Sequence, residues 1–504
     1  MTTPREAPPG ALPHAYAEVV TAPAPVVGFD LDMTLVDTRE RITASLVQTL
    51  AEVGVTVTPR QVWPFIGPPL GDTLSALAPG HEQAPLVARY RALHDDPTTA
   101  PLAALPGATE ALAAVRAAGG RTVVVSAKIT RAVALVLRQA GLDHLVDVAE
   151  GGRFAAEKAE VLLDQRAGVY VGDHPGDVLA ARAAGAVAVA VATGPSDAAT
   201  LTATGADVVL GDLSGFGAWF EDHLLDHRLS VLDDRLREIG SVVVAFSGGA
   251  DSALLLAAAV RAVGPQNVVA ATAVSDSLPA AELEAARTLA DHVGVRLVTP
   301  RTDELAREGY RANGGDRCFH CKAELLDVLV PVATEHGLDA VATGTNADDA
   351  AAGFRPGIRA AAERGAVTPL LDAGLTKVQV RRASRRWGLP TWDKPAAACL
   401  SSRVAFGVPV SAAGLRRVGA AEDAVRAGLL DASAPVTDLR VRDLGADRAR
   451  VELATATLDL ASPALLELVR NVVRTCGFTA VEVDPRGFRS GSMNELLADP
   501  EAFR

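Results

Sequence analysis

The sequence predicts an α/β protein with two parallel-sheet domains and a small C-terminal α+β domain. Near the start and near the middle, in PVVGFDLDMT and SVVVAFSGGADSALLLAAAV, an apolar strand leads into a loop rich in Asp, Gly or Ser and then into a helix. This order is how a parallel α/β domain begins. After KPAAACLSSR the pattern changes to helix, strand, strand, helix, strand, which indicates a small α+β domain at the end of the chain.

Length and composition allow this many domains. The chain has 504 residues, of which 49% are hydrophobic and 22% are charged, so it can bury real cores. At about 100–200 residues per domain, two to four domains are expected, and disordered and fibrous classes are excluded. The charged segment EDHLLDHRLSVLDDRLREIG has leucines at helical spacing and predicts a helix that leads into the second domain. We place the boundary near residue 225.

Charge and cysteine content restrict the partners. Lys plus Arg (48) minus Asp plus Glu (61) gives a net charge of −13, which repels a phosphate backbone unless basic residues are locally concentrated. Four cysteines in a chain this long form no disulfide framework, so a reducing compartment is expected. The N-terminus MTTPREAPPGALPHAYAEVV has no apolar signal-peptide core, and no window approaches the roughly 20 apolar residues of a membrane helix. We therefore expect a cytoplasmic protein without nucleic-acid or membrane partners.

The first candidate site follows the first strand. The apolar run of VVGFDLDMTLVDT ends at Asp30, and Asp32 follows two residues later. Open α/β folds place ligands at the carboxyl edge of the sheet, so both carboxylates can converge there. They suit a nucleophile and an acid/base partner around a divalent cation. Further polar residues lie at or beyond the ends of later strands: Ser126, Lys128, Lys158, Asp173 and Asp177.

In this order the residues resemble the four motifs of the haloacid dehalogenase-like phosphatases, over roughly residues 25–215. The resemblance implies a Rossmann-like domain with Asp30 as the nucleophile that forms an aspartyl-phosphate and Asp32 as the general acid/base. It implies that Ser126 and Lys158 hold the phosphoryl group. The stretch WPFIGPPLGDTLSAL resembles the small helical cap of the phosphoglycolate phosphatase and nucleotidase branch. The implied Mg²⁺ ligands are Asp30, Asp32, Asp173 and Asp177.

The second candidate site is a phosphate-binding loop. A buried strand in VVVAFSGGADSALLL delivers Ser247, Gly248, Gly249, Asp251 and Ser252 to a helix N-terminus. There, glycines let backbone N–H groups approach an anion, and the helix dipole favours negative charge. The loop lacks the G-K-[ST] ending of the Walker type. It resembles instead the SGG-x-DS loop of the ATP pyrophosphatase (PP-loop) enzymes, which have an adenine nucleotide alpha hydrolase-like fold and cleave ATP between the α and β phosphates.

Further blocks narrow this resemblance over about residues 238–497. VSDSLPAAELEAA, GGDRCFHCKAELL, ATGTNADDAAAGFRPG, GLTKVQVRRASRRWGLPTWDKPAAACLSSRVAFG and DPRGFRSGSMNEL resemble, in order, the ATP-dependent sulfur transferases that make the nickel-pincer nucleotide cofactor (LarE-type). The resemblance implies that a carboxylate of pyridinium-3,5-biscarboxylic acid mononucleotide is adenylated and receives sulfur. This mononucleotide and a phosphorylated small molecule are therefore the expected substrates. The family commonly forms oligomers, so a homo-oligomer is compatible with the sequence.

Three cysteines are candidates for the sulfur source. Cys399, in AAACLSSR, matches the family's sulfur-donor position. The family uses either this cysteine sacrificially, leaving dehydroalanine, or three cysteines that ligate a [4Fe–4S] cluster with one open iron. Cys318 and Cys321 form C-x-x-C, and we favour the cluster with Cys399 as third ligand. Buried thiols and a zinc site that includes His320 remain alternatives, and Cys476 is interpreted as core.

Fixed cations are expected to bind the substrate phosphate. Arg440 and Arg442 in DLRVRDL lie two residues apart on a predicted strand and share a face, and they match a basic pair of the family. Further candidates for the phosphate are Ser402, Arg403, Arg489 and Ser490. Glu452 and Asp349 are weaker candidates for a metal or the substrate.

These patterns give the expected domain boundaries and leave two alternative functions. The domains are an N-terminal tail at 1–24, a phosphatase domain at 25–220 with its cap at about 38–105, a linker helix at 221–237, a PP-loop domain at 238–407 and the α+β substrate-binding domain at 408–504. One alternative is a transfer-RNA thiolase, for which the basic cluster Arg381, Arg382, Arg385 and Arg386 is the sequence feature. The other is a nucleotide-sensing module that regulates the phosphatase without catalysis.

Overall fold

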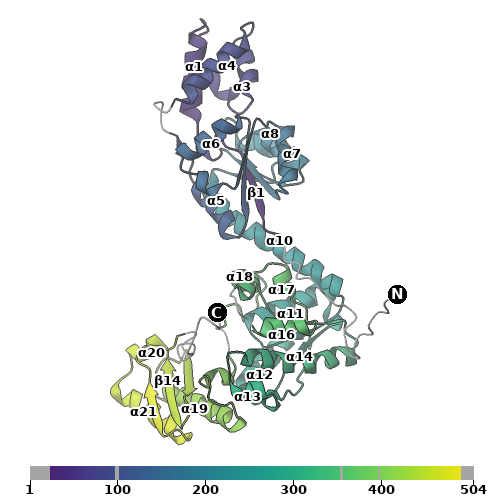
Figure 1. The fold of residues 1–504 in the computed structure, drawn as a ribbon, viewed down its shortest axis with the longest axis vertical. Helices are drawn as coiled ribbons and strands as arrows, with labels where there is room; N and C mark the ends of the chain where they lie inside the picture. Colours follow the sequence, from purple (N-terminus) through teal and green to yellow (C-terminus); the bar gives the residue numbers. More distant parts are fainter. Residues whose placement is uncertain (1–22, 97–101, 352–355, 396–397, 437, 490–504) are drawn as a thin grey trace, which may run out of the picture. The chain divides into compact units, whose positions relative to one another are not determined.

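The computed structural model describes residues 23–489 except 97–101, 352–355, 396–397 and 437 (Figure 1). Most of the expected N-terminal tail, residues 1–22, and the candidate Ser490 lie outside the described residues. The described chain forms two compact units that divide between Leu224 and Leu225. The predicted fold class, α/β with two parallel-sheet domains and a smaller α+β domain, is confirmed.

The first unit is built on a six-stranded parallel sheet in the order β5-β4-β1-β6-β7-β8. The strands are β1 (Val26–Phe29), β4 (Arg121–Ser126), β5 (Val148–Gly151), β6 (Val169–Gly172), β7 (Val187–Val191) and β8 (Val208–Leu210). α5 (Ala108–Ala117) precedes β4, and the helices that follow β4 to β7 are α6 (Thr130–Gln139), α7 (Ala156–Asp164), α8 (Pro175–Ala183) and α9 (Ala198–Thr204). The strands are almost continuously apolar, as is typical of strands that are buried on both faces. Two apolar cores accordingly pack against this sheet. The chain order reverses beside β1, and this is where open α/β sheets bind ligands.

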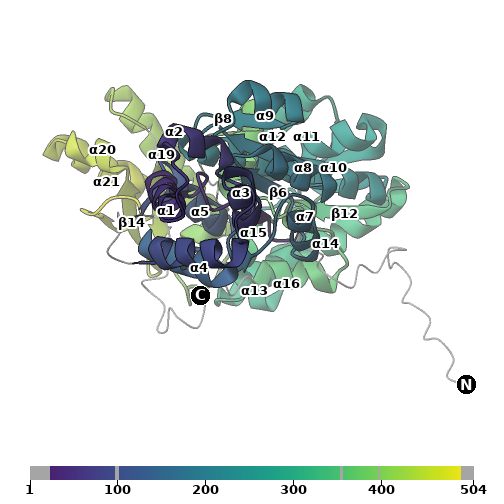
Figure 2. The same cartoon turned by 90° about the horizontal axis from the view of Figure 1, so that it is seen from above.

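A helical cap interrupts this unit after β1. Its helices are α1 (Arg39–Ala51), α2 (Pro59–Val62), α3 (Leu70–Leu77) and α4 (Gln83–His94). The short strands β2 (Val36–Asp37) and β3 (Ala103–Ala104) pair antiparallel on either side of the cap in sequence. Figures 1 and 2 both show α1 and α4 side by side, and the cap has an apolar core of its own.

The long helix α10 (Phe216–Ile239) carries the chain from the first unit into the second. Its first apolar residues, Phe216, Phe220 and Leu224, belong to a core of the first unit. Leu225, Leu232, Leu236 and Ile239 belong to a core of the second. Each unit therefore buries a different part of one helix.

The second unit begins with a four-stranded parallel sheet in the order β11-β10-β9-β12. Its strands are β9 (Val242–Ala245), β10 (Val268–Ala271), β11 (Arg296–Val298) and β12 (Ala340–Thr343). The helices around it are α11 (Ala250–Val263), α12 (Ala280–Val293), α13 (Glu308–Ala312), α14 (Arg317–Glu335), α15 (Ala347–Ala351), α16 (Pro356–Glu363), α17 (Pro369–Asp372) and α18 (Lys377–Arg386). The loop after β9 lies beside the ends of β10 and β12, at the point where strand order reverses.

The C-terminal part of this unit is a three-stranded sheet with helices. β13 (Leu439–Asp443) pairs antiparallel with β14 (Arg448–Leu453), and β14 pairs parallel with β15 (Ala480–Val483). α19 (Ala412–Asp431) and α21 (Pro463–Thr475) pack with the sheet around a shared apolar core. A short helix that the sequence pattern did not predict, α20 (Thr455–Asp459), follows β14.

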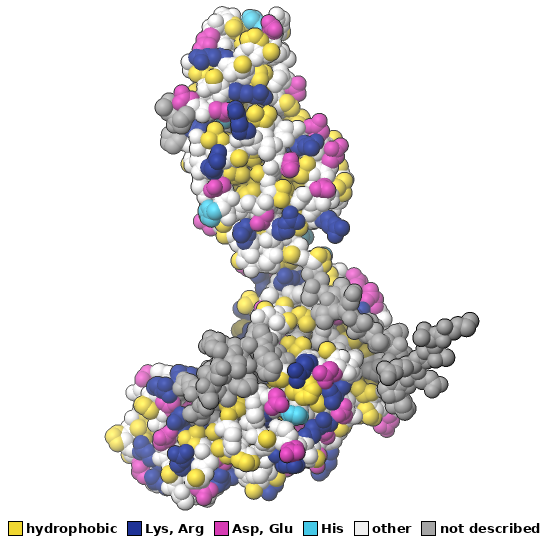
Figure 3. Space-filling view, viewed as in Figure 1, with side chains coloured by type: hydrophobic (Ala, Val, Ile, Leu, Met, Phe, Trp, Pro, Cys, Tyr) yellow, Lys and Arg dark blue, Asp and Glu magenta, His cyan; other side chains and the backbone are white. Residues whose placement is uncertain are grey.

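The surface carries charges of both signs. In Figure 3, Lys and Arg side chains are interspersed with Asp and Glu over the visible face of both units. In the predicted basic cluster, Arg381 donates hydrogen bonds to main-chain oxygens and Arg386 pairs with Asp226. Within the described part of the chain, no helix combines the length and the apolar character needed to cross a membrane.

Candidate active sites

The first site forms where three neighbouring strands end. Asp30 directly follows β1, Ser126 is the last residue of β4, and Asp173 directly follows β6. The Asp30 backbone N–H donates to the carbonyl oxygen of Val171 at 2.8 Å, which extends the pairing of β1 with β6 by one residue. Because these parallel strands are adjacent, residues far apart in sequence meet at one edge of the sheet.

Lys158 links two of the carboxylates. It lies near the start of α7 and is 4% exposed. Its Nζ lies 2.6 Å from Oδ1 of Asp30 and 2.6 Å from Oδ1 of Asp177. Although burial disfavours the charged form, Asp177 and Asp30 raise the pKa of Lys158 well above its usual range. Lys158 is therefore a fixed cation between them.

Three buried carboxylates form a metal-binding group. Ligand oxygens of Asp30, Asp173 and Asp177 all lie within 4.8 Å of one another, the one such group among the described residues. Burial raises the pKa of Asp30 to about 7, with Lys158 opposing the shift and Asp177 adding to it. Burial and then Asp30 raise the pKa of Asp173 well above its usual range. Such crowding of carboxylates favours a divalent cation, which prefers oxygen ligands.

Asp32 has a different environment from the other three aspartates. Its Oδ1 lies 2.9 Å from Nζ of Lys128. Burial opposes ionisation, but the charge and hydrogen bond of Lys128 lower the pKa of Asp32. Ser126 is buried, and its Oγ accepts a hydrogen bond from the Lys128 backbone N–H at 3.2 Å. Asp32 thus lies outside the metal-binding group and faces Lys128.

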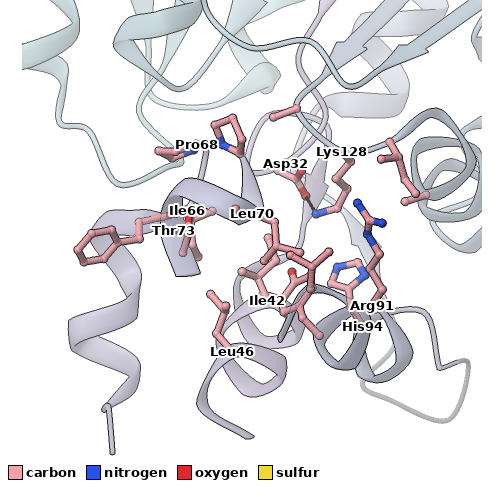
Figure 4. A pocket seen from close by; sticks show the side chains of 18 of the residues that line it. Asp32, Ile42, Leu46, Ile66, Pro68, Leu70, Thr73, Arg91, His94 and Lys128 are labelled. Carbon is pink, nitrogen blue, oxygen red and sulfur yellow. Dashed lines mark hydrogen bonds and ion pairs between the residues drawn. The ribbon is translucent and has the colours of Figure 1, made fainter. Parts of the chain in front are cut away.

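A cavity of 370 Å³ extends from Asp32 and Lys128 to the cap (Figure 4). Most of its lining comes from α1, α3, α4 and the segment before α3. His94, at the end of α4, is buried and lines this cavity. The sequence analysis did not single out His94, because no motif surrounds it.

The second site is the loop between β9 and α11. Gly248 has φ = +67°, a conformation that glycine adopts without strain. The Ser247 backbone N–H donates to Oγ of Ser252 at 3.3 Å, so the loop folds back on the start of the helix. A cavity of 310 Å³ is lined by Ser247, Gly249, Asp251 and Ser252 together with residues from β10, the loop after β12 and α14. Backbone N–H groups at a helix N-terminus suit an anion such as a phosphate chain.

Three lysines from distant segments surround this loop, and the sequence analysis assigned a role to none of them. Lys377 Nζ lies 2.5 Å from Oδ2 of Asp251. Lys394 Nζ donates to the carbonyl oxygen of Gly248 at 3.2 Å and pairs with Glu282 at 2.8 Å. Lys322 lines the cavity, and burial lowers its pKa. The one signal in the sequence is that Lys322 directly follows the C-x-x-C.

The structure brings the candidate cysteines together from two segments. Cys318 and Cys321 lie at the start of α14, and Cys399 precedes the 3-10 turn Leu400–Arg403. Hydrogen bonds join the segments: Arg317 Nη1 donates to the carbonyl oxygen of Ser401 at 2.8 Å, and Tyr310 bonds to the Ser401 side chain. Burial, then Cys399, Glu304 and Cys318, raise the pKa of Cys321 to about 12.

The histidine between the two cysteines has a carboxylate partner. His320 Nε2 lies 3.2 Å from Oδ2 of Asp316. Cysteine thiolates serve as ligands for zinc as well as for iron–sulfur clusters, so the thiols alone do not choose between the two. Cys476 packs against the C-terminal core.

The structure separates the predicted phosphate-binding arginines into two groups. Arg403 and Arg442 are buried in ion pairs with Glu422 and Glu452, respectively. Arg403 also donates to the Cys399 carbonyl oxygen, and Arg442 to that of Ser402. The Cys399 segment is therefore anchored on α19 through Arg403 and on β13 through Arg442.

The second group of predicted phosphate ligands consists of residues outside these two buried ion pairs. Arg440 stacks over the ring of Phe488, and Arg489 lies 3.5 Å from Asp484. Burial and Arg403 lower the pKa of Arg440. The Ser402 hydroxyl donates to the Cys399 carbonyl oxygen at 2.7 Å. Asp349 lines the cavity at the phosphate loop.

Comparisons with known protein families match both parts of the chain. The haloacid dehalogenase-like hydrolase family matches residues 27–191, and the NAD synthase family matches residues 225–309. A pyrophosphatase of Bacillus velezensis is 30% identical over 37% of this chain and 91% of its own length. A haloacid dehalogenase-like hydrolase structure from Streptococcus pneumoniae is 21% identical, covers 39% of this chain and 98% of its own, and has a TM-score of 0.36.

Two curated proteins match the C-terminal half over nearly their whole length. An uncharacterized protein of Synechocystis sp. is 39% identical over 54% of this chain and 99% of its own length. Pyridinium-3,5-bisthiocarboxylic acid mononucleotide synthase of Lactiplantibacillus plantarum is 33% identical over 52% of this chain and 92% of its own length.

Proposed function

We propose a function from the premise that the chain belongs to the haloacid dehalogenase-like hydrolases in its first half and to the family of pyridinium-3,5-bisthiocarboxylic acid mononucleotide synthase in its second. It is a bifunctional enzyme, with a hydrolase domain and an ATP-utilising PP-loop domain. The first domain is a Mg²⁺-dependent phosphatase of small molecules. The second adenylates a carboxylate of pyridinium-3,5-biscarboxylic acid mononucleotide and replaces the activated oxygen with sulfur. The three converging carboxylates with Lys158 at the first site, and the glycine loop at a helix N-terminus at the second, support the two activities.

The phosphatase reaction uses two aspartates in separate roles. A carboxylate oxygen of Asp30 attacks phosphorus, and the bond from phosphorus to the leaving oxygen breaks. Asp32 donates a proton to that oxygen and then removes one from the water that hydrolyses the aspartyl-phosphate, releasing phosphate and restoring Asp30. The Lys158 ammonium between Asp30 and Asp177 balances negative charge beside the nucleophile.

The three carboxylates that converge at the first site fit a divalent cation. Asp30, Asp173 and Asp177 would hold Mg²⁺, because their oxygens converge and burial disfavours the charged forms of Asp30 and Asp173. Bound there, the ion would neutralise charge on the phosphoryl oxygens. Thr34 donates to Oδ1 of Asp173 at 3.0 Å and fixes the orientation of that carboxylate.

The sulfur transferase reaction begins at the phosphate loop. The loop from Ser247 to Ser252 holds the phosphates of ATP, while the substrate carboxylate oxygen attacks the α-phosphorus and pyrophosphate leaves. A sulfur nucleophile then attacks the acyl carbon, and AMP leaves with the bridging oxygen. Lys394 contacts the loop at Gly248 and lies five residues before Cys399, so one short segment connects the two half-reactions. Arg440 and Arg489 are proposed to bind the phosphate of the mononucleotide.

The sulfur source is proposed to be a [4Fe–4S] cluster on Cys318, Cys321 and Cys399. The influence of Cys399 and Cys318 on the pKa of Cys321 supports this set of ligands. Three protein ligands leave one iron free, and that iron would supply a bound hydrosulfide. The alternative is that Cys399 gives up its own sulfur and becomes dehydroalanine.

Metal analysis separates these two sulfur sources. The protein is purified anaerobically, and its visible absorption, iron and acid-labile sulfide are measured for the wild type and for Cys318→Ala. Iron near four per chain that is lost in Cys318→Ala supports the cluster. Colourless, iron-free protein after reconstitution contradicts it and favours a single use of Cys399, which mass spectrometry detects as the loss of H₂S.

The fusion suggests that the phosphatase acts on a phosphorylated compound of the same pathway, because its substrate and by-products are phosphorylated small molecules. The full-length protein is assayed with nucleotides, the pathway mononucleotide and unrelated sugar phosphates. Turnover of the first two classes supports the shared pathway. Exclusive turnover of a sugar phosphate contradicts it.

A further inference from the structure

The cap cavity contains a buried histidine that the proposed phosphatase steps do not use. His94 is 3% exposed, and its Nε2 has no hydrogen-bond partner among the described residues. A buried polar atom without a partner is energetically unfavourable. In Figure 4 the imidazole ring lies between Ile42 and Arg91, on the wall of the 370 Å³ cavity. The ring is therefore part of the lining of this cavity.

The surroundings of the ring determine which hydrogen-bonding group it offers. Nδ1 lies 3.3 Å from Oδ1 of Asp95. A carboxylate only accepts hydrogen bonds, so Nδ1 carries the hydrogen. Burial and Lys128 lower the pKa of His94 to about 4, and the ring is therefore neutral near pH 7. Tyr90 stacks on it with centroids 5.4 Å apart. Nε2 thus offers a lone pair to a donor.

The rest of the cavity wall is mostly apolar. Ile42, Leu46, Ile66, Leu70 and Val87 are among its lining residues. The volume of 370 Å³ falls in the range of small-molecule sites, much larger than one phosphate group requires. This wall suits a leaving group with an apolar surface. A charged leaving group would lose its hydration there without gaining polar contacts from the wall.

The cations at the cavity are few. Lys128 is already paired with Asp32 at 2.9 Å, and Arg91 is exposed to solvent. A leaving group with a second negative charge, such as phosphate or glycolate, would enter an apolar space with little compensation. A neutral ring with an N–H or O–H group would match both the apolar wall and the lone pair of Nε2.

We infer, on the basis of the phosphatase function proposed above, that the substrate is a phosphomonoester of a neutral, ring-bearing alcohol such as a nucleoside, and that His94 Nε2 accepts a hydrogen bond from the ring or its hydroxyls. His94 is thus a specificity residue that contacts the leaving group. Pyrophosphate and phosphoglycolate are poor substrates of this cavity.

The test compares substrates within single preparations of the full-length protein with Mg²⁺. The substrates are the four common ribonucleoside 5′-monophosphates, phenyl phosphate (a ring without a donor), pyrophosphate and phosphoglycolate. For the wild type we expect kcat/KM to be highest for a nucleoside monophosphate. We expect His94→Phe, which keeps an aromatic ring beside Tyr90, to lower the ratio of this kcat/KM to that for phenyl phosphate by about tenfold or more. His94→Gln retains an acceptor and lowers the ratio less.

His81→Phe is the matched control, because His81 is an exposed cap histidine outside the cavity lining. It leaves the ratio unchanged. The ratio does not depend on the folded fraction of a variant, so partial unfolding does not imitate the effect. An unchanged ratio in His94→Phe, or a wild-type preference for pyrophosphate or phosphoglycolate, overturns the inference and leaves the phosphatase function standing. No hydrolysis of any substrate above the level of Asp30→Asn overturns both.

Discussion

The two candidate active sites have the same topological position and opposite electrostatic character. Each lies at the carboxyl end of a central strand, β1 in one sheet and β9 in the other, where the strand order reverses. At the first, three buried carboxylates converge and burial raises the pKa of Asp30 to about 7. At the second, a glycine loop leads into a helix N-terminus and lysines come in from other segments.

This difference shows that the sheet fixes where a ligand binds and the loop fixes which chemistry follows. The first loop supplies a side-chain nucleophile and requires a cation. The second supplies backbone N–H groups that hold the phosphates of ATP while the substrate carboxylate attacks the α-phosphorus. Loss of one activity is therefore expected to leave the other intact, and the predictions for Asp30 and Lys322 below test that independence.

Cys399→Ala is expected to have the largest effect. Without the third thiol, no thiocarboxylate product forms, because either sulfur source needs Cys399. Adenylation does not need it, so exchange of labelled pyrophosphate into ATP continues at a rate within about threefold of the wild type. Product is measured by mass spectrometry and exchange by radiolabel. Thiocarboxylate formation by Cys399→Ala would contradict the role of this residue.

Asp30→Asn is expected to lower phosphatase kcat by about 10³-fold or more, because the amide is a much poorer nucleophile than the carboxylate. Pyrophosphate release from ATP at the second site stays at the wild-type rate. Asp37→Asn is the matched control, since Asp37 is an exposed aspartate at the end of β2. If Asp30→Asn abolished both activities, the two sites would not be independent.

Lys322→Met is expected to reduce the kcat/KM of pyrophosphate release by about 10- to 100-fold. The side chain lines the phosphate-loop cavity, and its ammonium supplies charge to the departing pyrophosphate. Phosphatase activity, measured in the same preparation, serves as the control and does not change. An unaffected kcat/KM for ATP would assign Lys322 to packing alone.

The cap is expected to lose local stability at mildly acidic pH. The pKa of His94 is lowered to about 4 in the folded state, against about 6.5 unfolded, so the unfolded state binds more protons between these values and stability falls as pH falls through this window. From neutral pH to pH 5 the loss is about 2 kcal/mol. Hydrogen exchange of α4 peptides, corrected for intrinsic rates, measures it. His94→Phe removes this pH dependence, and an equal dependence in that variant would contradict the prediction.

The parts that could be predicted from the sequence are those fixed by local pattern. Strand periodicity predicts that β1, β4 and β6 end at Asp30, Ser126 and Asp173, and parallel pairing then brings these residues together. The same reasoning predicts the fold class. It does not predict the short helix α20, which follows β14. Alternation along β13 predicts that Arg440 and Arg442 share a face.

The parts that could not be predicted depend on packing between distant segments. Nothing local in the sequence indicates that Glu452 would hold Arg442 in a buried ion pair, leaving Arg440 more accessible. His94 enters its cavity from a cap helix without any motif. Lys377 and Lys394 reach the phosphate loop from segments more than a hundred residues away.

The helix α10 has a practical consequence for any attempt to study the two activities apart. Phe216, Phe220 and Leu224 complete a core of the first unit, and Leu225, Leu232, Leu236 and Ile239 complete a core of the second. If the gene were divided on either side of this helix, the unit without the helix would expose the apolar core residues that the helix covers. The unit that keeps the helix would expose the helix's remaining apolar residues, which favours aggregation. During synthesis, the first unit cannot complete its core until Leu224 has left the ribosome. By then the first residues of the second unit have already been synthesised. Separate expression therefore requires a redesigned helix rather than a simple truncation.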